Sequence, residues 1–104
     1  MKVVQTRIGE DAAIALQGRL DSSTVQSCEA ALLRFVEDGR KAVILDLSGV
    51  EYIGGQGLRV LVLAQRRAES LGIPFSLRNP SPAAADVLAV AGEGLFAAVQ
   101  VADG

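Results

Sequence analysis

The sequence contains no histidine and no tryptophan, and it has one cysteine and three prolines in 104 residues. Without histidine the chain lacks the commonest general base, the usual activator of a nucleophilic serine or cysteine, and the commonest metal ligand. These absences argue against an enzyme, and neither a metal nor a cofactor is expected. The lone Cys28 excludes a disulfide within the chain and fits a reducing compartment. We interpret it as a buried thiol that acts as a small hydrophobic group.

Aromatic residues and clustered charge are also scarce. Only 4% of the residues are aromatic, which leaves few rings on which nucleic-acid bases could stack. Ten basic and twelve acidic residues are scattered along the chain for a net charge of -2, so no basic face for nucleic acid is expected. The first seven residues lack the apolar core of a secretory signal, and the apolar run Leu58–Ala64 is far shorter than the ~20 residues of a bilayer span. A cytoplasmic protein without membrane insertion is therefore expected.

The hydrophobic residues that are present suffice for one small core. They make up half of the chain, and a chain of this length removes roughly two-thirds of its unfolded surface from water. No internal repeat, low-complexity tract or linker divides the sequence, so residues 1–104 are expected to form one domain.

The first half of the chain carries the signals of a hairpin, a helix and a buried strand. Val3–Arg7 and Ala12–Gln17 predict two strands of a hairpin. Ser23 is the predicted N-cap of the following helix, with Gln26 completing a capping box and Gly39 ending the helix. The apolar stripe of this helix consists of Val25, Cys28, Leu32, Phe35 and Val36. The run Val43–Leu45 is typical of a central strand that helices cover on both faces.

The second half predicts two more helices with a strand between them. The helix from Gly57 to about Leu71 ends at Gly72, and its inward residues are Leu58, Leu61, Ala64, Ala68 and Leu71. A strand over Phe75–Leu77 closes with a turn at Asn79–Pro80. Ser81 and Pro82 then begin a short helix that Gly92 ends, whereas Leu95–Val101 fits either a helix or a strand. The order β-β-α-β-α-β-α predicts an α/β domain, a small mixed sheet of about four strands packed with helices.

Two sets of residues deserve a chemical test. Asp21, Asp46 and Glu51 lie near the predicted sheet edge, so a carboxylate pair for acid–base work stays open beside their simpler roles in helix entry and solvation. The glycine turn, Gly54–Gly57, opens a helix but lacks the spacing and the Gly-Lys-Ser/Thr ending of phosphate-binding loops. We therefore favour a tight helix entry, whose bare N–H groups form a weakly positive surface.

Four segments, in order, resemble the STAS family, which includes the bacterial anti-sigma factor antagonists. They are Leu16–Thr24, Ala42–Ile53, Gly57–Leu61 and Asn79–Phe96. The resemblance covers nearly the whole chain and implies a STAS-like domain at residues 1–104. It further implies a non-catalytic, protein-binding regulator of transcription in a partner-switching system, whose partner is an anti-sigma factor or a serine-kinase-type regulator.

The resemblance also implies a site and a departure from the family. Partner-switching relatives carry Asp-Ser or Ser-Ser just before the second helix, and a kinase phosphorylates the second residue. Gly54 and Gly55 stand there in this chain, so the phosphoacceptor-equivalent position, Gly55, cannot be phosphorylated. Ser22, Ser23 and Ser48 stay open as secondary acceptors. The implied partner-binding residues are Asp21, Ser22, Ser23, Gly54, Gly55, Gln56, Gly57 and Arg59.

Two points stay open in the sequence. Val62 and Leu63 fit either the core or the partner-binding surface, because the second helix is apolar over a wide arc. A regulatory or structural subunit of a transporter ATPase or of a chemosensory assembly needs the same kind of exposed protein-binding face as an anti-sigma factor antagonist. A small-ligand or nucleotide binder that uses the glycine turn is a third, weaker hypothesis.

Overall fold

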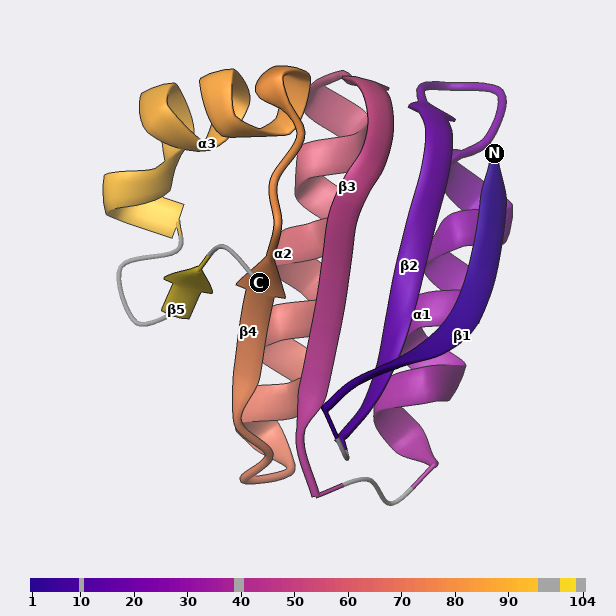
Figure 1. Ribbon diagram of the computed structural model, residues 1–104, viewed down its shortest axis with the longest axis vertical. Coiled ribbons are helices and arrows are strands. Elements are labelled where there is room, and N and C mark those ends of the chain that lie inside the picture. Colours follow the sequence, from indigo (N-terminus) through magenta and orange to yellow (C-terminus); the bar gives the residue numbers. More distant parts are fainter. Residues whose placement is uncertain (10, 39–40, 96–99, 103–104) are drawn as a thin grey trace.

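A computed structural model describes the backbone of residues 1–9, 11–38, 41–95 and 100–102, and the side chains of the described residues up to Val90. One mixed sheet has the strand order β1-β2-β3-β4-β5, in which β1 is antiparallel to β2 and all other neighbours are parallel (Figure 1). The elements are β1 (Lys2–Ile8), β2 (Asp11–Leu20), α1 (Val25–Glu37), β3 (Val43–Ile53), α2 (Gly55–Ser70), β4 (Phe75–Arg78), α3 (Pro82–Leu95) and β5 (Gln100–Ala102). The predicted α/β class and mixed sheet are confirmed, and β5 adds a short edge strand within the segment that the sequence left ambiguous.

The core lies between the sheet and the helix pair α1 and α2. Both helices lie behind the sheet in Figure 1, and the predicted stripe of α1 is buried from Cys28 to Val36. Leu61, Ala64 and Ala68 of α2 are also buried, as predicted. Leu71 is 44% exposed, so its inward assignment was wrong: α2 ends at Ser70, and Leu71 already lies beyond the last helical turn.

The central strand β3 is covered differently from the prediction. Because α1 and α2 lie on the same face of the sheet, they cannot cover both faces of β3. The buried Leu45 and Leu47 alternate with the half-buried Asp46 and the exposed Ser48, as in a strand with one face toward the core. Val43, Ile44 and Leu45 are all buried, so both faces of β3 are shielded over the predicted run, although α1 and α2 lie on one face only.

The helix ends follow local hydrogen bonds. The predicted capping box of Ser23 and Gln26 is wrong: Thr24 is the N-cap residue of α1 and makes no side-chain capping hydrogen bond, and the Ser23 hydroxyl donates to the Asp21 carboxylate at 2.7 Å. Ser81 caps α3 as predicted: its Oγ accepts a hydrogen bond from the Ala84 N–H at 3.1 Å. Gly72 has a φ of 70° and follows α2 as predicted.

Gly92 and Gly39 are the two other glycines at which the sequence predicted that a helix ends. Helix α3 continues through Gly92 to Leu95, because glycine permits the left-handed conformation that ends a helix but does not impose it. Gly39, the predicted end of α1, lies outside the described residues. Within the described residues, none of the helices combines the length and the hydropathy needed to cross a bilayer.

Irregular pairing shapes the carboxyl ends of β2 and β3. Ile14 pairs with Leu45, and six residues later Leu20 pairs with Ile53, so β3 carries two extra residues over this stretch. Such bulges change which side chains face the core. Val50 and Ile53 stay buried, whereas the two residues between them, Glu51 and Tyr52, are both exposed.

Candidate protein-binding site

The loop from β2 to α1 and the glycine turn from β3 to α2 meet at the upper end of the sheet in Figure 1. The Gly54 N–H donates to the Leu20 carbonyl oxygen at 3.1 Å, which ties the turn to the end of β2. An open depression of about 230 Å³ lies between the two segments. Its lining consists of Asp21, Ser22, Tyr52, Gly54, Gly55 and Gln56. Five of the predicted site residues therefore share one surface, to which the fold adds Tyr52.

Asp21 organises the loop on the β2 side. Its Oδ1 accepts hydrogen bonds from the Ser23 backbone N–H at 3.0 Å and from the Ser23 hydroxyl at 2.7 Å. These two bonds, together with the Arg19 guanidinium, lower the pKa of Asp21 below its usual value. Thr24 Oγ1 donates to the Arg19 carbonyl oxygen at 2.8 Å and accepts from the Asp21 N–H at 3.0 Å. The loop thus presents a negative charge in a position fixed by local hydrogen bonds.

The glycine turn presents bare backbone. Gly54 has a φ of -92°, and Gly55 is not among the described residues with a positive φ, so neither conformation demands glycine. A Cβ at Gly54 would lie 3.1 Å from the Tyr52 hydroxyl oxygen, whereas a Cβ at Gly55 would have no heavy atom within 4 Å. Gly55 is exposed and has room for a side chain. The backbone at Gly55 could therefore carry a serine, and the missing hydroxyl does not result from a conformational requirement for glycine.

Gly57 has a different role from its neighbours. It is buried, and a Cβ at this position would lie 2.6 Å from Leu20 Cγ and 2.9 Å from the Leu20 carbonyl oxygen. Gly57 therefore lets the first turn of α2 pack directly against the end of β2. We assign it to this packing and leave it out of the contact surface. Arg59, two residues later, is exposed.

Tyr52 is the residue that the sequence reasoning missed. Its side chain is 42% exposed, and the Arg19 Cζ lies 4.4 Å from its ring centroid. Arg19 Nε also lies 3.6 Å from Asp21 Oδ2, so Arg19 connects the loop on the β2 side with Tyr52 on β3. As the single tyrosine in the chain, at a position in phase with the outward-facing Asp46 and Ser48, it could have been singled out from the sequence.

Two more hollows continue from the glycine turn along α2. One, of about 290 Å³, is lined by Val25, Glu29, Gln56, Arg59, Val60 and Leu63. The other, of about 320 Å³, is lined by Gly55, Leu58, Arg59, Val62, Leu63 and Arg66. Val62 is only 8% exposed and Leu63 is half-buried, yet both line the second hollow. The two residues thus belong to the edge of the core and to the surface at once.

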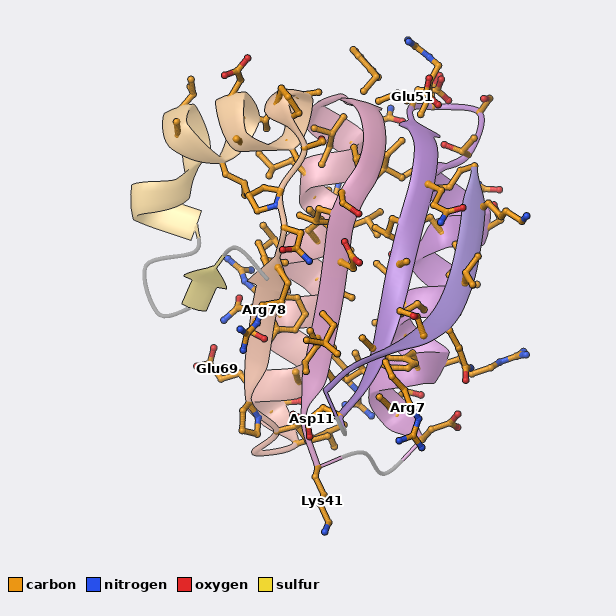
Figure 2. The ribbon with its side chains drawn as sticks, viewed as in Figure 1. Arg7, Asp11, Lys41, Glu51, Glu69 and Arg78 are labelled. Carbon is orange, nitrogen blue, oxygen red and sulfur yellow. The ribbon has the colours of Figure 1, made fainter. Side chains whose placement is uncertain are left out.

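Asp46 lies far from the end of the sheet that carries Asp21, the first of the three predicted carboxylates. Asp46 pairs with Ala15 and Arg78 in the sheet, and its Oδ1 accepts from the Ser48 N–H at 2.9 Å. It lies seven residues before Ile53 on β3, which is roughly 23 Å from the end of the sheet that carries Asp21. The expectation that Asp46 shares that end was therefore wrong. Figure 2 shows Glu51 at this upper end, and its side chain is exposed.

Two further kinds of reactive group are possible metal ligands and the Cys28 thiol. Among the residues that the structure describes, no three His, Cys, Asp or Glu side chains are grouped as metal ligands would be. Cys28 is fully buried, and burial raises the pKa of its thiol to about 11, so the thiol is neutral near pH 7. Its interpretation as a small hydrophobic group is confirmed.

Comparisons with known proteins agree with this architecture. The model of the family described as "Mlab, STAS domain" matches residues 3–94. BtrV of Bordetella bronchiseptica, assigned as an anti-sigma factor antagonist, is 29% identical over 92 residues, which cover 88% of this chain and 79% of BtrV.

Solved structures show the same fold at lower identity. A protein of Thermotoga maritima, also assigned as an anti-sigma factor antagonist, superposes with a TM-score of 0.79 at 21% identity, covering 98% of this chain and 86% of that one. Unphosphorylated SpoIIAA, an anti-sigma factor antagonist, gives a TM-score of 0.74 at 19% identity, covering 99% of this chain and 89% of that one. SpoIIAA from Bacillus has also been solved in a phosphorylated form, with a TM-score of 0.71 at 20% identity, covering 99% of this chain and 91% of that one. Since the family model spans nearly the whole chain, this protein belongs to the STAS domain family.

Proposed function

We propose that this chain is a non-catalytic, protein-binding regulator of the anti-sigma factor antagonist type, whose partner is an anti-sigma factor or a serine-kinase-type regulator. The observation that carries the proposal is the single exposed surface formed by the β2–α1 loop and the glycine turn. We call this surface the binding face and define it by Asp21, Ser22, Ser23, Tyr52, Gly54, Gly55, Gln56 and Arg59. The naming of BtrV and SpoIIAA as antagonists of anti-sigma factors supports the partner class.

The binding face has the features of a protein contact. Tyr52 offers a large, partly exposed ring whose position is supported by Arg19, and tyrosine is enriched among the residues that dominate binding energy at interfaces. The bare backbone at Gly54 and Gly55 allows close approach, and the first N–H groups of α2 have no acceptor within the helix. A partner would meet one aromatic anchor, one fixed carboxylate and a weakly positive helix start.

We further propose that binding at this face is constitutive. In a relative with serine at the position of Gly55, phosphorylation would add about 1.5 to 2 negative charges beside the Asp21 carboxylate. That added charge would change both the desolvation cost and the charge complementarity of the surface. Glycine has no hydroxyl, so the turn keeps one charge state in this chain.

Affinity capture from native lysate tests the proposal. The bait is the parent chain, compared with Gly55→Asp and with Ala85→Asp, which adds the same charge at an exposed position early in α3. We expect the parent and Ala85→Asp to capture a protein of the anti-sigma factor or kinase class, and Gly55→Asp to lose it. Capture of a transporter ATPase or a chemosensory subunit would support the subunit role instead, and micromolar nucleotide binding would support a ligand-binding role.

Incubation with a captured kinase and ATP tests the constitutive state. Residues 54–57 carry no hydroxyl, so mass spectrometry should find them unmodified. Stoichiometric phosphorylation of Ser22, Ser23 or Ser48 that abolishes binding would show that the switch has moved to another residue. The constitutive reading would then be wrong, although the protein-binding role would stand.

A further inference from the structure

Helix α2 is positively charged in a chain that is negatively charged as a whole. It carries Arg59, Arg66 and Arg67 against a single Glu69, a net charge of 3 - 1 = +2, whereas the whole chain has a net charge of -2. Arg67 pairs with Glu37 of α1 at 3.0 Å. Arg59 and Arg66 are exposed, and neither forms an ion pair with any residue that the structure describes. Two arginine side chains on this helix therefore lack an ionic partner within the described part of the chain.

Apolar side chains lie between the two free arginines. We call this surface the arginine groove and define it by Leu58, Arg59, Val62, Leu63 and Arg66, which line the hollow of about 320 Å³. Arg59 and Arg66 are seven residues apart, or about 10 Å along the helix axis. Gly55 lines the same hollow, so the groove is continuous with the binding face. An apolar floor with a cation toward each end is thus presented beside the glycine turn.

We propose that the arginine groove receives an amphipathic helix of the protein partner, with apolar residues on the groove floor and carboxylates on Arg59 and Arg66. This inference rests on the proposed function and adds the chemistry of the partner element. A helix is favoured over an added strand because α2 covers a face of the sheet, away from the edge strands β1 and β5 that could extend it. The apolar face of an amphipathic helix can pack on the groove floor while its acidic side chains reach the two arginines.

The charges around the groove also give the partner helix an orientation. Glu29 of α1 lines the neighbouring hollow together with Arg59 and Leu63. Arg59 borders both hollows, whereas Glu29 lines only the hollow beside α1 and Arg66 only the one away from it, so a carboxylate on the outer side of α2 meets both arginines without facing Glu29. The acidic edge of the partner helix is therefore expected on the side of α2 that is remote from α1.

Calorimetric titration of the captured partner tests the proposal. The double variant Arg59→Glu/Arg66→Glu should weaken binding at least about tenfold, because both contacts become repulsive. The matched control Lys41→Glu reverses a charge at the lower end of the sheet in Figure 2 and should bind like the parent. Raising the salt concentration should weaken the parent more than the double variant, since salt screens these ion pairs. Thermal melts check that each variant is folded.

A charge swap identifies the contact directly. A photo-reactive residue at Leu63 should cross-link to an acidic helical segment of the partner, and reversing a carboxylate of that segment to arginine should restore binding to the double variant. Cross-linking to a basic or an extended segment would overturn the inference. Self-association of the parent that the double variant abolishes would instead make a second copy of this chain the occupant.

The outcomes separate the two proposals. If Gly55→Asp abolishes binding while the double variant binds like the parent, the arginine groove, Arg59 included, is not part of the interface, although the proposed function stands. If neither variant changes the affinity, the groove and the binding face both lie outside the interface. If no partner of the anti-sigma factor or kinase class is captured, the proposed function itself fails.

Discussion

Replacing Gly57 with alanine should destabilise the protein even though alanine is the better helix former. The added Cβ would lie 2.6 Å from Leu20 Cγ and 2.9 Å from the Leu20 carbonyl oxygen, and the second contact involves backbone that cannot rotate away. Overpacking of this kind costs about 1–3 kcal/mol in the free energy of unfolding. The intrinsic preference of a helix interior for alanine over glycine offsets at most about 1 kcal/mol of that cost. We expect a net destabilisation of about 1–2 kcal/mol.

Gly55→Ala is the matched control, because the same methyl group two residues earlier meets no heavy atom within 4 Å. It should leave the free energy of unfolding unchanged or raise it by up to about 1 kcal/mol. Urea denaturation with equal m-values measures both differences, and the melting temperature of Gly57→Ala should fall by about 4–8 °C for each kcal/mol. If Gly57→Ala were as stable as the parent, α2 would not pack on the end of β2 as described here.

Three further predictions concern the core and the titrating groups. Leu45→Ala and Leu61→Ala should each lower the free energy of unfolding by about 2–5 kcal/mol, whereas Arg66→Ala should change it by no more than about 0.5 kcal/mol. Parent-like urea midpoints for both leucine variants would contradict the assigned core. The folded-state pKa of Asp21 lies below its usual value of 3.8, so its stabilising contribution is present above that pH and is lost as the pH falls through the lowered pKa. Between about pH 5 and pH 3 the melting temperature of Asp21→Asn should therefore fall less than that of the parent. Equal falls in melting temperature would count against the Ser23 hydrogen bonds to Asp21. Cys28 should resist a thiol reagent at about pH 8 until the protein is unfolded, and rapid labelling of the native protein would contradict its burial.

The elements that sequence reasoning recovered are those with a strong local period or stop signal. The stripe from Cys28 to Val36 repeats at the helical period and is buried, and Ser81 caps α3 through a contact three residues away. Leu71 shows the limit of the same reasoning, because the period does not reveal where the last turn ends. Similarly, Ser23 and Thr24 are both residue types that often cap helices, yet neither side chain caps α1, since the Ser23 hydroxyl bonds to Asp21 and Thr24 makes no capping hydrogen bond.

The candidate site depended more on tertiary structure. The three glycines Gly54, Gly55 and Gly57 look alike in the sequence, yet only Gly57 packs against Leu20 and only Gly55 faces open space. Tyr52 points outward in phase with Asp46 and Ser48, so alternation along β3 alone predicts its exposure, whereas its contact with Arg19 of β2 depends on the pairing of the two strands. The resemblance pointed to the end of the sheet where five of the predicted site residues line one depression, but the burial of Gly57 and the contact of Tyr52 with Arg19 required the fold.

The most direct test of binding at the glycine turn compares the affinity of the captured partner for the parent and for Gly55→Asp. Gly55 is not at a positive φ and has free space around it, so the aspartate should change the melting temperature little. If the partner contacts the glycine turn, the fixed negative charge should weaken binding by at least about 1.4 kcal/mol, or tenfold, in calorimetric titration. Equal affinities for parent and variant would contradict the account: the interface would then lie elsewhere, and Gly54 and Gly55 would serve only to form the turn.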